Sequence, residues 1–132
     1  MLCVRPCLDE QYKEQVLSDL GLSGDSTELL TAEENGRILG YAAVKPQGLE
    51  LEILSLSIAD CADYSAPNDD NMEIAEYLIR AVGNYAYNRM IPALSCVLPE
   101  LDAILIRLGF EKIDNLSRIN IKKLFNSCKS CE

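Results

Sequence analysis

The sequence predicts an α+β (α/β) domain with a mixed, mostly antiparallel central sheet flanked by helices. Three observations lead to this class. Asn35-Gly36 lies between two apolar segments, which is the strongest short signal for a β-hairpin. Residues 49–59 carry apolar side chains on both alternating faces, as in a central strand that is covered on both sides. Residues 71–88 instead repeat their apolar side chains at helical spacing.

The elements before the central strand follow from local start and stop signals. Asp9 is a good N-cap for a helix, and Gly21 favours the end of that helix. Pro6 is expected to stop a preceding edge strand. The predicted order is a strand at 2–4, a helix at 10–20, a loop at 22–27, and strands at 28–33 and 37–45.

The second half of the chain starts with the central strand. Asp70 is expected to cap the following helix, with Glu73 three residues later at capping-box spacing. Pro99 suits the first turn of a short helix, and Gly109 suits its end. The predicted order is a strand at 49–59, an acidic loop at 60–70, a helix at 71–88, a strand at 91–98, a helix at 99–108, and strands at 110–114 and 117–124.

Length and charge limit the class of protein. A chain of 132 residues is expected to form one domain, here residues 1–125, followed by a polar tail at 126–132 that contains a CxxC motif. The formal charge of −9 argues against nucleic acid as a partner, because phosphate binding needs clustered basic residues. No apolar run approaches the length of a membrane span, and the N-terminus has no secretory signal, so a cytoplasmic location away from membranes is expected.

The sequence contains no histidine. This excludes every catalytic dyad or triad that depends on imidazole, and every metal site that needs a histidine ligand. Any general base must therefore be a carboxylate, a tyrosine, a lysine, a cysteine, a chain terminus or a water molecule.

Two residue groups could hold a metal ion, although the simpler interpretation of both is structural, and no metal is expected. Four cysteines near the chain ends could bind zinc, or pair as redox dithiols, if the ends meet: Cys3, Cys7, Cys128 and Cys131. The acidic loop could bind a cation through Asp60, Asp63, Asn68, Asp69 and Asp70. Its spacing does not match an EF-hand, and acidic residues are favoured at a helix start by the helix dipole.

Two segments resemble a known family. Residues 98–111, Leu-Pro-Glu-Leu-Asp-Ala-Ile-Leu-Ile-Arg-Leu-Gly-Phe-Glu, resemble the late helix of GNAT N-acetyltransferases, which ends in Gly-Phe and enters a strand. Gly40-Tyr41-Ala42-Ala43 after the Asn35-Gly36 hairpin resembles a β-ribbon of the same family. Together with the order of elements, the resemblance covers nearly the whole chain. It implies a GNAT-like fold in which one of the two early helices is missing.

The resemblance implies acetyl-CoA as cofactor. In that family the central strand pairs with the arm of the cofactor, which points to Leu56, Ser57 and Ile58. The next helix opens with a [QR]-x-x-G-x-[GA] motif that cradles the pyrophosphate, because backbone N–H groups and the helix dipole attract an anion. The motif aligns with residues 70–75, so the implied cofactor contacts include Asn71, Met72, Ile74 and Ala75.

This alignment also places two carboxylates against the pyrophosphate. Asp70 stands where the family has a basic or amide residue, and Glu73 stands at the first glycine. Like charges at such a distance raise the free energy of binding. Cofactor binding is therefore expected to be weak or altered.

The catalytic candidates come from the same resemblance and from side-chain chemistry. Glu50 or Glu52 could remove a proton from an amine, although both could also be exposed strand carboxylates. Many family members have a tyrosine as general acid in the late helix, but the matching residue here is Leu105. Tyr64 is the predicted proton donor in its place, with Tyr85 and Tyr87 as further candidates, although tyrosines at helical spacing usually pack.

Two functions remain open from the sequence. The first is an N-acyltransferase that moves an acyl group from acyl-CoA to a small-molecule or peptide amine, with weak or lost activity. The alternative is a non-catalytic GNAT-like binding or regulatory domain that no longer binds acetyl-CoA in the standard way. Whether the chain is an enzyme, and whether it forms a homodimer, is left open.

Overall fold

The protein forms one seven-stranded sheet with helices on both faces. The computed structural model describes residues 2–22 and 26–126. The strand order is β1-β2-β3-β4-β5-β7-β6. The elements are β1 (Cys3–Pro6), α1 (Glu10–Asp19), β2 (Glu28–Glu34), β3 (Arg37–Gln47), β4 (Glu50–Ile58), α2 (Asp69–Asn88), β5 (Ala93–Cys96), a 3-10 turn η1 (Pro99–Leu101), α3 (Asp102–Arg107), β6 (Glu111–Ile113), β7 (Leu116–Asn120) and α4 (Ile121–Asn126).

The sheet is mixed and mostly antiparallel, which confirms the predicted class. Only β4 and β5 pair in parallel among the described strands, because α2 carries the chain back across the sheet between them. The Asn35-Gly36 turn joins β2 to β3 with positive φ at both residues (54° and 79°), as the hairpin signal requires. None of the described helices is long and apolar enough to cross a lipid bilayer.

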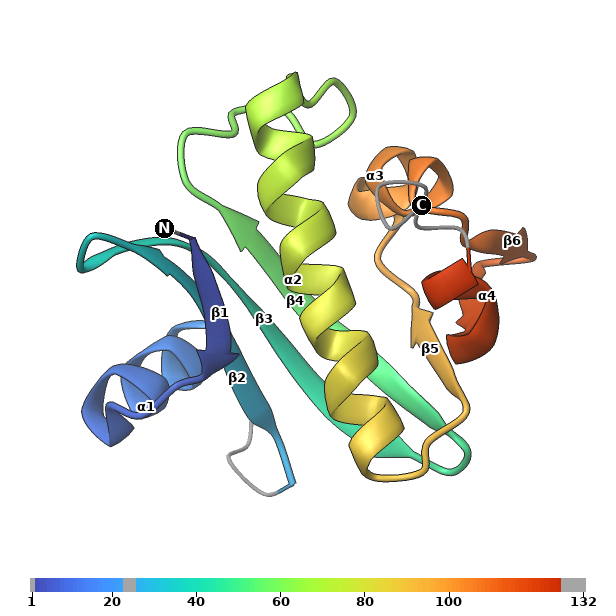
Figure 1. Ribbon diagram of the computed structural model, residues 1–132, viewed down its shortest axis with the longest axis horizontal. Coiled ribbons are helices and arrows are strands. Elements are labelled where there is room, and N and C mark those ends of the chain that lie inside the picture. Colours follow the sequence, from blue (N-terminus) through green and yellow to red (C-terminus); the bar gives the residue numbers. More distant parts are fainter. Residues whose placement is uncertain (1, 23–25, 127–132) are drawn as a thin grey trace.

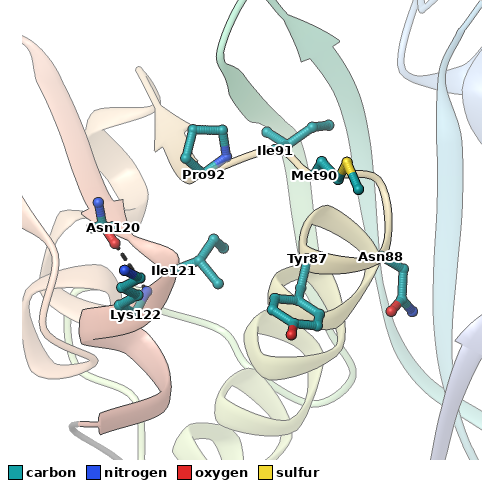
Figure 2. A pocket seen from close by; sticks show the side chains of 8 residues that line it. All are labelled: Tyr87, Asn88, Met90, Ile91, Pro92, Asn120, Ile121 and Lys122. Carbon is teal, nitrogen blue, oxygen red and sulfur yellow. Dashed lines mark hydrogen bonds between the residues drawn. The ribbon is translucent and has the colours of Figure 1, made fainter.

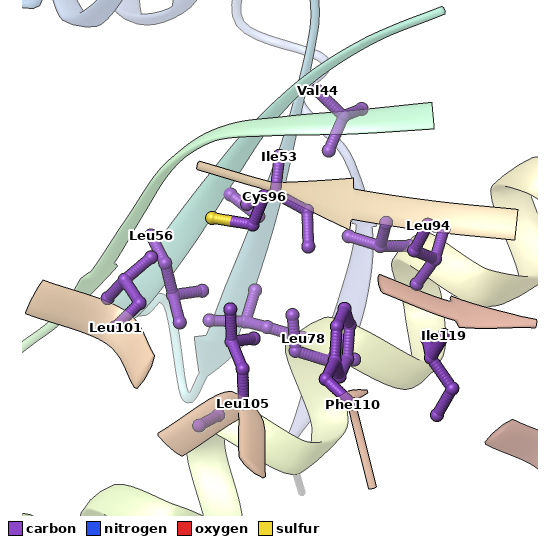
Figure 3. Packing of buried hydrophobic residues seen from close by; sticks show 14 of the residues in the cluster. Val44, Ile53, Leu56, Leu78, Leu94, Cys96, Leu101, Leu105, Phe110 and Ile119 are labelled. Atoms are coloured by element: carbon purple, nitrogen blue, oxygen red, sulfur yellow. The ribbon is translucent and has the colours of Figure 1, made fainter. Parts of the chain in front are cut away.

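Successive side chains along a strand point to opposite faces of the sheet, so each face carries its own hydrophobic core. Leu30 and Ala42 face the side of the sheet that carries α2, and their neighbours Leu29 and Ala43 face α1 on the other side. The larger core lies under α2 and extends to α3 and α4 (Figures 1 and 3). The central strand β4 does not keep the alternation expected from the sequence. A bulge opposite Ala43 and Val44 places Leu51, Ile53, Leu56 and Ile58 all in the core on the α2 side, whereas Leu54 packs against the core on the α1 side.

The cap of α2 differs from the prediction. The helix starts at Asp69, and its N-cap is Asn68 rather than Asp70. The Asn71 N–H donates to Asn68 Oδ1 (2.8 Å), and the Asn68 N–H donates to Asn71 Oδ1 (3.2 Å), so two asparagines form the capping box. Asn71 is buried, whereas Asp70 is exposed. The chain thus begins its first turn earlier than the Asp70–Glu73 spacing suggests.

The predicted last strand, 117–124, is also wrong in its second half. β7 ends at Asn120, and residues Ile121–Asn126 form α4. Asn120 Oδ1 accepts a hydrogen bond from the Lys122 N–H (2.9 Å), which starts the helix. Leu124 then packs against α2, where a Cβ on Gly83 would meet Leu124 Cδ2 at 2.5 Å. The alternating Ile119 and Ile121 imitate a strand, but contact with α2 favours a helix.

Candidate functional site

The candidate site starts where β4 and β5 separate. The two strands pair only from Glu50 to Glu52, opposite Ala93 to Ser95. β4 then continues to Ile58, while the chain of β5 turns away after Cys96 towards η1 (Figure 1). The second half of β4 therefore has an edge with no strand beside it among the described residues. We call residues 53–58 on this side the β4 edge.

The loop after β4 covers the end of the β4 edge. The Ala59 N–H donates to Leu39 O on β3, so the backbone groups of Ile58 point the other way, towards the β4 edge. The Ile58 N–H donates to the phenol oxygen of Tyr64 (3.1 Å), and Ile58 O accepts from the Cys61 N–H (3.3 Å). Tyr64 thus lies at the end of the β4 edge, where its hydroxyl accepts a hydrogen bond from the strand itself.

The other two predicted cofactor contacts on β4 are Leu56 and Ser57, and their backbone groups point in opposite directions. Leu56 has the same backbone direction as Ile58, and no other described residue hydrogen-bonds to its N–H or C=O. Ser57 points its backbone groups towards β3 and its side chain towards the α1 face, opposite Tyr41. An incoming amide would therefore pair with Leu56, while Ser57 holds β4 to β3.

The N-terminus of α2 offers few free backbone donors. A helix start leaves four N–H groups unpaired, and the capping box uses those of Asn68 and Asn71. Only the N–H groups of Asp69 and Asp70 remain without a described partner. The other predicted contacts lie deeper in the helix: Met72 donates its N–H to Asn68 O, Ile74 is in the second turn, and Ala75 is fully buried.

The charge at this helix start does not fit a pyrophosphate. Asp69, Asp70 and Glu73 are all exposed within the first turns of α2. The carboxylates already interact favourably with the positive end of the helix dipole, and each such interaction contributes about 0.3–1 kcal/mol. A pyrophosphate would meet these negative charges instead of the basic side chain that would attract it. These carboxylates would repel the diphosphate of a cofactor placed at the start of α2.

The two candidate bases differ in their partners. Glu50 forms an ion pair with Arg118 of β7, a contact between residues 68 positions apart that no local sequence pattern indicates. Glu52 is half-buried, and the described residues offer it no hydrogen bond or ion pair. It lies beside Ser95 at the last paired position before β4 and β5 separate. Glu52 therefore differs from Glu50 in having no ion pair among the described residues, and Lys45 of β3 lies opposite it.

The remaining candidate acids, Tyr85 and Tyr87, have packing roles, as does the buried cysteine Cys96. Tyr85 stacks under the guanidinium of Arg89 (3.6 Å to the ring centre), and Tyr87 makes an edge contact with Phe125 (6.3 Å between ring centres). Both lie near the C-terminal end of α2, away from Tyr64. Cys96 lies close to Leu56 and Leu101 in the core (Figure 3), and burial raises the pKa of its thiol to about 11, so it stays protonated at neutral pH.

The structure groups no set of three potential metal ligands among residues 2–22 and 26–126. In the acidic loop, the carboxylate of Asp63 accepts hydrogen bonds from the side chain and N–H of Ser65 (2.6 and 2.9 Å), which lower the pKa of Asp63. Cys3 is exposed and Cys7 is half-buried. Cys128 and Cys131 lie outside the described residues, as does the predicted tail after Asn126.

The sequence matches no family model, and none of the curated proteins is similar to it in sequence. Solved structures are similar in three dimensions. The ribosomal-protein-S18-alanine N-acetyltransferase of Escherichia coli is 10% identical, with a TM-score of 0.65 and 92% of this chain and 94% of that chain covered. A GNAT-family acetyltransferase of Staphylococcus aureus is 12% identical, with a TM-score of 0.65 and 92% and 99% covered.

A third similar structure was determined with its cofactor. It is a GNAT-family acetyltransferase from Elizabethkingia anophelis with acetyl-CoA bound, 15% identical, with a TM-score of 0.61 and 90% and 97% of the two chains covered. At these identities the likeness establishes the architecture alone. The chain has the GNAT acetyltransferase fold, as the resemblance predicted.

Proposed function

We propose that this chain is a binding domain built on the GNAT fold, which does not hold acetyl-CoA in the standard way. The observation that carries the proposal is the start of α2. There the capping box occupies two of the four backbone donors, and the two remaining donors belong to Asp69 and Asp70. A ligand without phosphate groups avoids this negative charge.

The ligand that fits the β4 edge is a short chain with one or two amide groups. Leu56 offers one free N–H and one free C=O, and the loop bonds to Ile58 end the available edge. A ligand amide can add to such an edge as another strand would. The ligand class is therefore a small amide, such as an acylated arm or a short peptide, rather than a nucleotide.

Calorimetry with two related ligands tests this proposal. We expect no saturable heat with acetyl-CoA at millimolar concentration. Acetyl-pantetheine, which has the same arm without diphosphate or nucleotide, should bind saturably in the same range. Asp70→Arg should bring acetyl-CoA binding into the measurable millimolar range, because it replaces a repulsive charge with an attractive one. Asp19→Arg on α1 changes the net charge equally and is the matched control. Micromolar binding of acetyl-CoA that weakens when the nucleotide is removed would contradict the proposal.

A second function, N-acyl transfer to an amine, is favoured by one observation. Glu52 lies where β4 and β5 part and has no ion partner among the described residues, so it is free to accept a proton from an attacking amine. Glu50, two residues earlier on the same face, is paired with Arg118.

The two carboxylates provide a matched test of acyl transfer. If the chain transfers acetyl groups, Glu52→Gln should lower kcat by about a hundredfold, because the amine must lose its proton, while Glu50→Gln should leave kcat within a few-fold. The readout is thiol release from acetyl-pantetheine and from acetyl-CoA with a panel of primary amines. Equal losses in the two variants would show that Glu52 is not the base. No thiol release from either donor would leave the binding domain as the function.

A further inference from the structure

A hollow lies at the C-terminal end of α2, away from the β4 edge. Its volume is about 670 Å³, within the range of small-molecule sites. Three segments line it: the last turn of α2, the loop into β5, and the junction of β7 with α4 (Figure 2). We call it the α2–α4 pocket, and its lining residues are Tyr87, Asn88, Met90, Ile91, Pro92, Asn120, Ile121 and Lys122.

Backbone hydrogen bonds fix the walls of this pocket. The Ile121 N–H donates to Pro92 O (2.9 Å) and joins the start of α4 to the loop before β5. The Ile91 N–H donates to Ala86 O (2.9 Å), which ties the same loop to α2. Met90, in the loop between α2 and β5, has a φ of 60°, a conformation that non-glycine residues seldom adopt. The pocket is therefore held open by the fold rather than by loose side chains.

Its walls expose an unusual amount of apolar surface. Met90 is 92% exposed and Tyr87 is 66% exposed, although both are large apolar side chains. Ile121 is buried and points into the hollow (Figure 2). A ligand with an apolar body would remove part of this surface from water, which favours binding in proportion to the area covered.

The charge of the pocket is opposite to that of the chain. Lys122 is the one charged residue among the eight described residues that line it, in a protein with a formal charge of −9. Lys122 forms no ion pair with another described residue, whereas the neighbouring Lys123 pairs with Glu111 (3.1 Å). The pocket thus combines apolar walls with one lysine that has no ion pair among the described residues. Multiply charged anions would be repelled by the rest of the surface.

We propose that the α2–α4 pocket binds a small amphiphilic carboxylate, with the apolar body between Tyr87, Met90 and Ile121 and the carboxylate near Lys122. A single negative charge matches the single ammonium group, and the apolar body matches the walls. This site is separate from the β4 edge, so it does not depend on the function proposed there.

Octanoate is a suitable probe, and protein-observed NMR on the full chain is a suitable readout. We expect saturable shifts of the Ile121 and Met90 methyl signals at millimolar octanoate. Affinity should rise about twofold to fourfold per methylene from butanoate to octanoate, because each added group covers apolar surface. Shifts that do not saturate, or an affinity independent of chain length, would overturn the proposal.

Two adjacent lysines separate the charge contact from a general effect of net charge. Lys122→Gln should weaken octanoate binding by about fivefold at low salt, and Lys123→Gln should leave it unchanged. Octanol, which has the same body without the charge, should bind both variants equally. Equal weakening in the two variants would mean that octanoate responds only to net charge, and the proposed carboxylate contact would then be wrong.

Discussion

Leu105→Tyr is expected to lower the free energy of unfolding by about 4 kcal/mol, although it restores the residue that many GNAT enzymes use as general acid. Leu105 is fully buried in the core between α3 and α2. A tyrosine there adds ring volume to a closely packed site, which costs about 1–3 kcal/mol. Its hydroxyl would be buried without a partner, which costs about 1–3 kcal/mol more.

Leu105→Phe is the matched control for this change, because it adds the ring without the hydroxyl. We expect it to cost about half as much, and urea unfolding followed by circular dichroism measures both variants. Acyl-transfer assays of folded Leu105→Tyr should show no gain in rate. A stable Leu105→Tyr variant with an increased rate would mean that the side chain reaches the site, and that Leu105 is buried only because leucine is apolar.

Gly40→Ala is expected to lower the free energy of unfolding by about 3 kcal/mol. Gly40 lies on β3 opposite Ile58, and a Cβ there would meet Ser57 O at 2.5 Å and Leu78 Cδ1 at 3.2 Å. The first contact is with backbone, so β3 and β4 would have to move apart. Because this movement displaces the β4 edge, we expect faster amide exchange at Ser57 and Ile58 as well as lower stability.

Gly48→Ala provides a comparison without a collision. Gly48 has a φ of 62° at the β3–β4 turn, and nothing lies within 4 Å of its added Cβ. Its replacement should cost about 1 kcal/mol from the backbone conformation alone, with normal amide exchange at Ser57. If the two alanine variants are equally stable, the close approach at Gly40 does not control the position of β4.

Local patterns in the sequence were sufficient for most elements. The Asn35-Gly36 turn, the Asp9 cap of α1 and the helical repeat of α2 each depend on residues within a few positions of one another, and all three are present. The Asp9 carboxylate accepts hydrogen bonds from the N–H groups of Gln11 and Tyr12, as its position predicted. The absence of histidine likewise limited the chemistry without any structure.

Two predictions from the sequence are wrong: the cap of α2 and the second half of the last strand. Asn68 and Asp70 are both acceptable caps, and burial of the Asn71 side chain decides between them. Ile119 and Ile121 alternate as in a strand, and contact of Leu124 with Gly83 turns the second half into α4. The cap of α2 thus depends on a local pair of asparagines, Asn68 and Asn71, whereas α4 depends on a contact with α2 that is distant in sequence.

The sequence by itself determined the GNAT-like architecture, the acidic character of the α2 start and the restriction to non-histidine chemistry. Only the tertiary structure decided which groups are free to act. Arg118 pairs with Glu50, whereas Glu52 has no ion pair among the described residues, and Tyr64 closes the end of the β4 edge at Ile58. The α2–α4 pocket likewise depends on Pro92 meeting Ile121. The periodicity of the sequence shows which face of an element is apolar. Whether a hydrogen-bond donor or a carboxylate has a partner depends on residues that folding brings close from elsewhere in the chain.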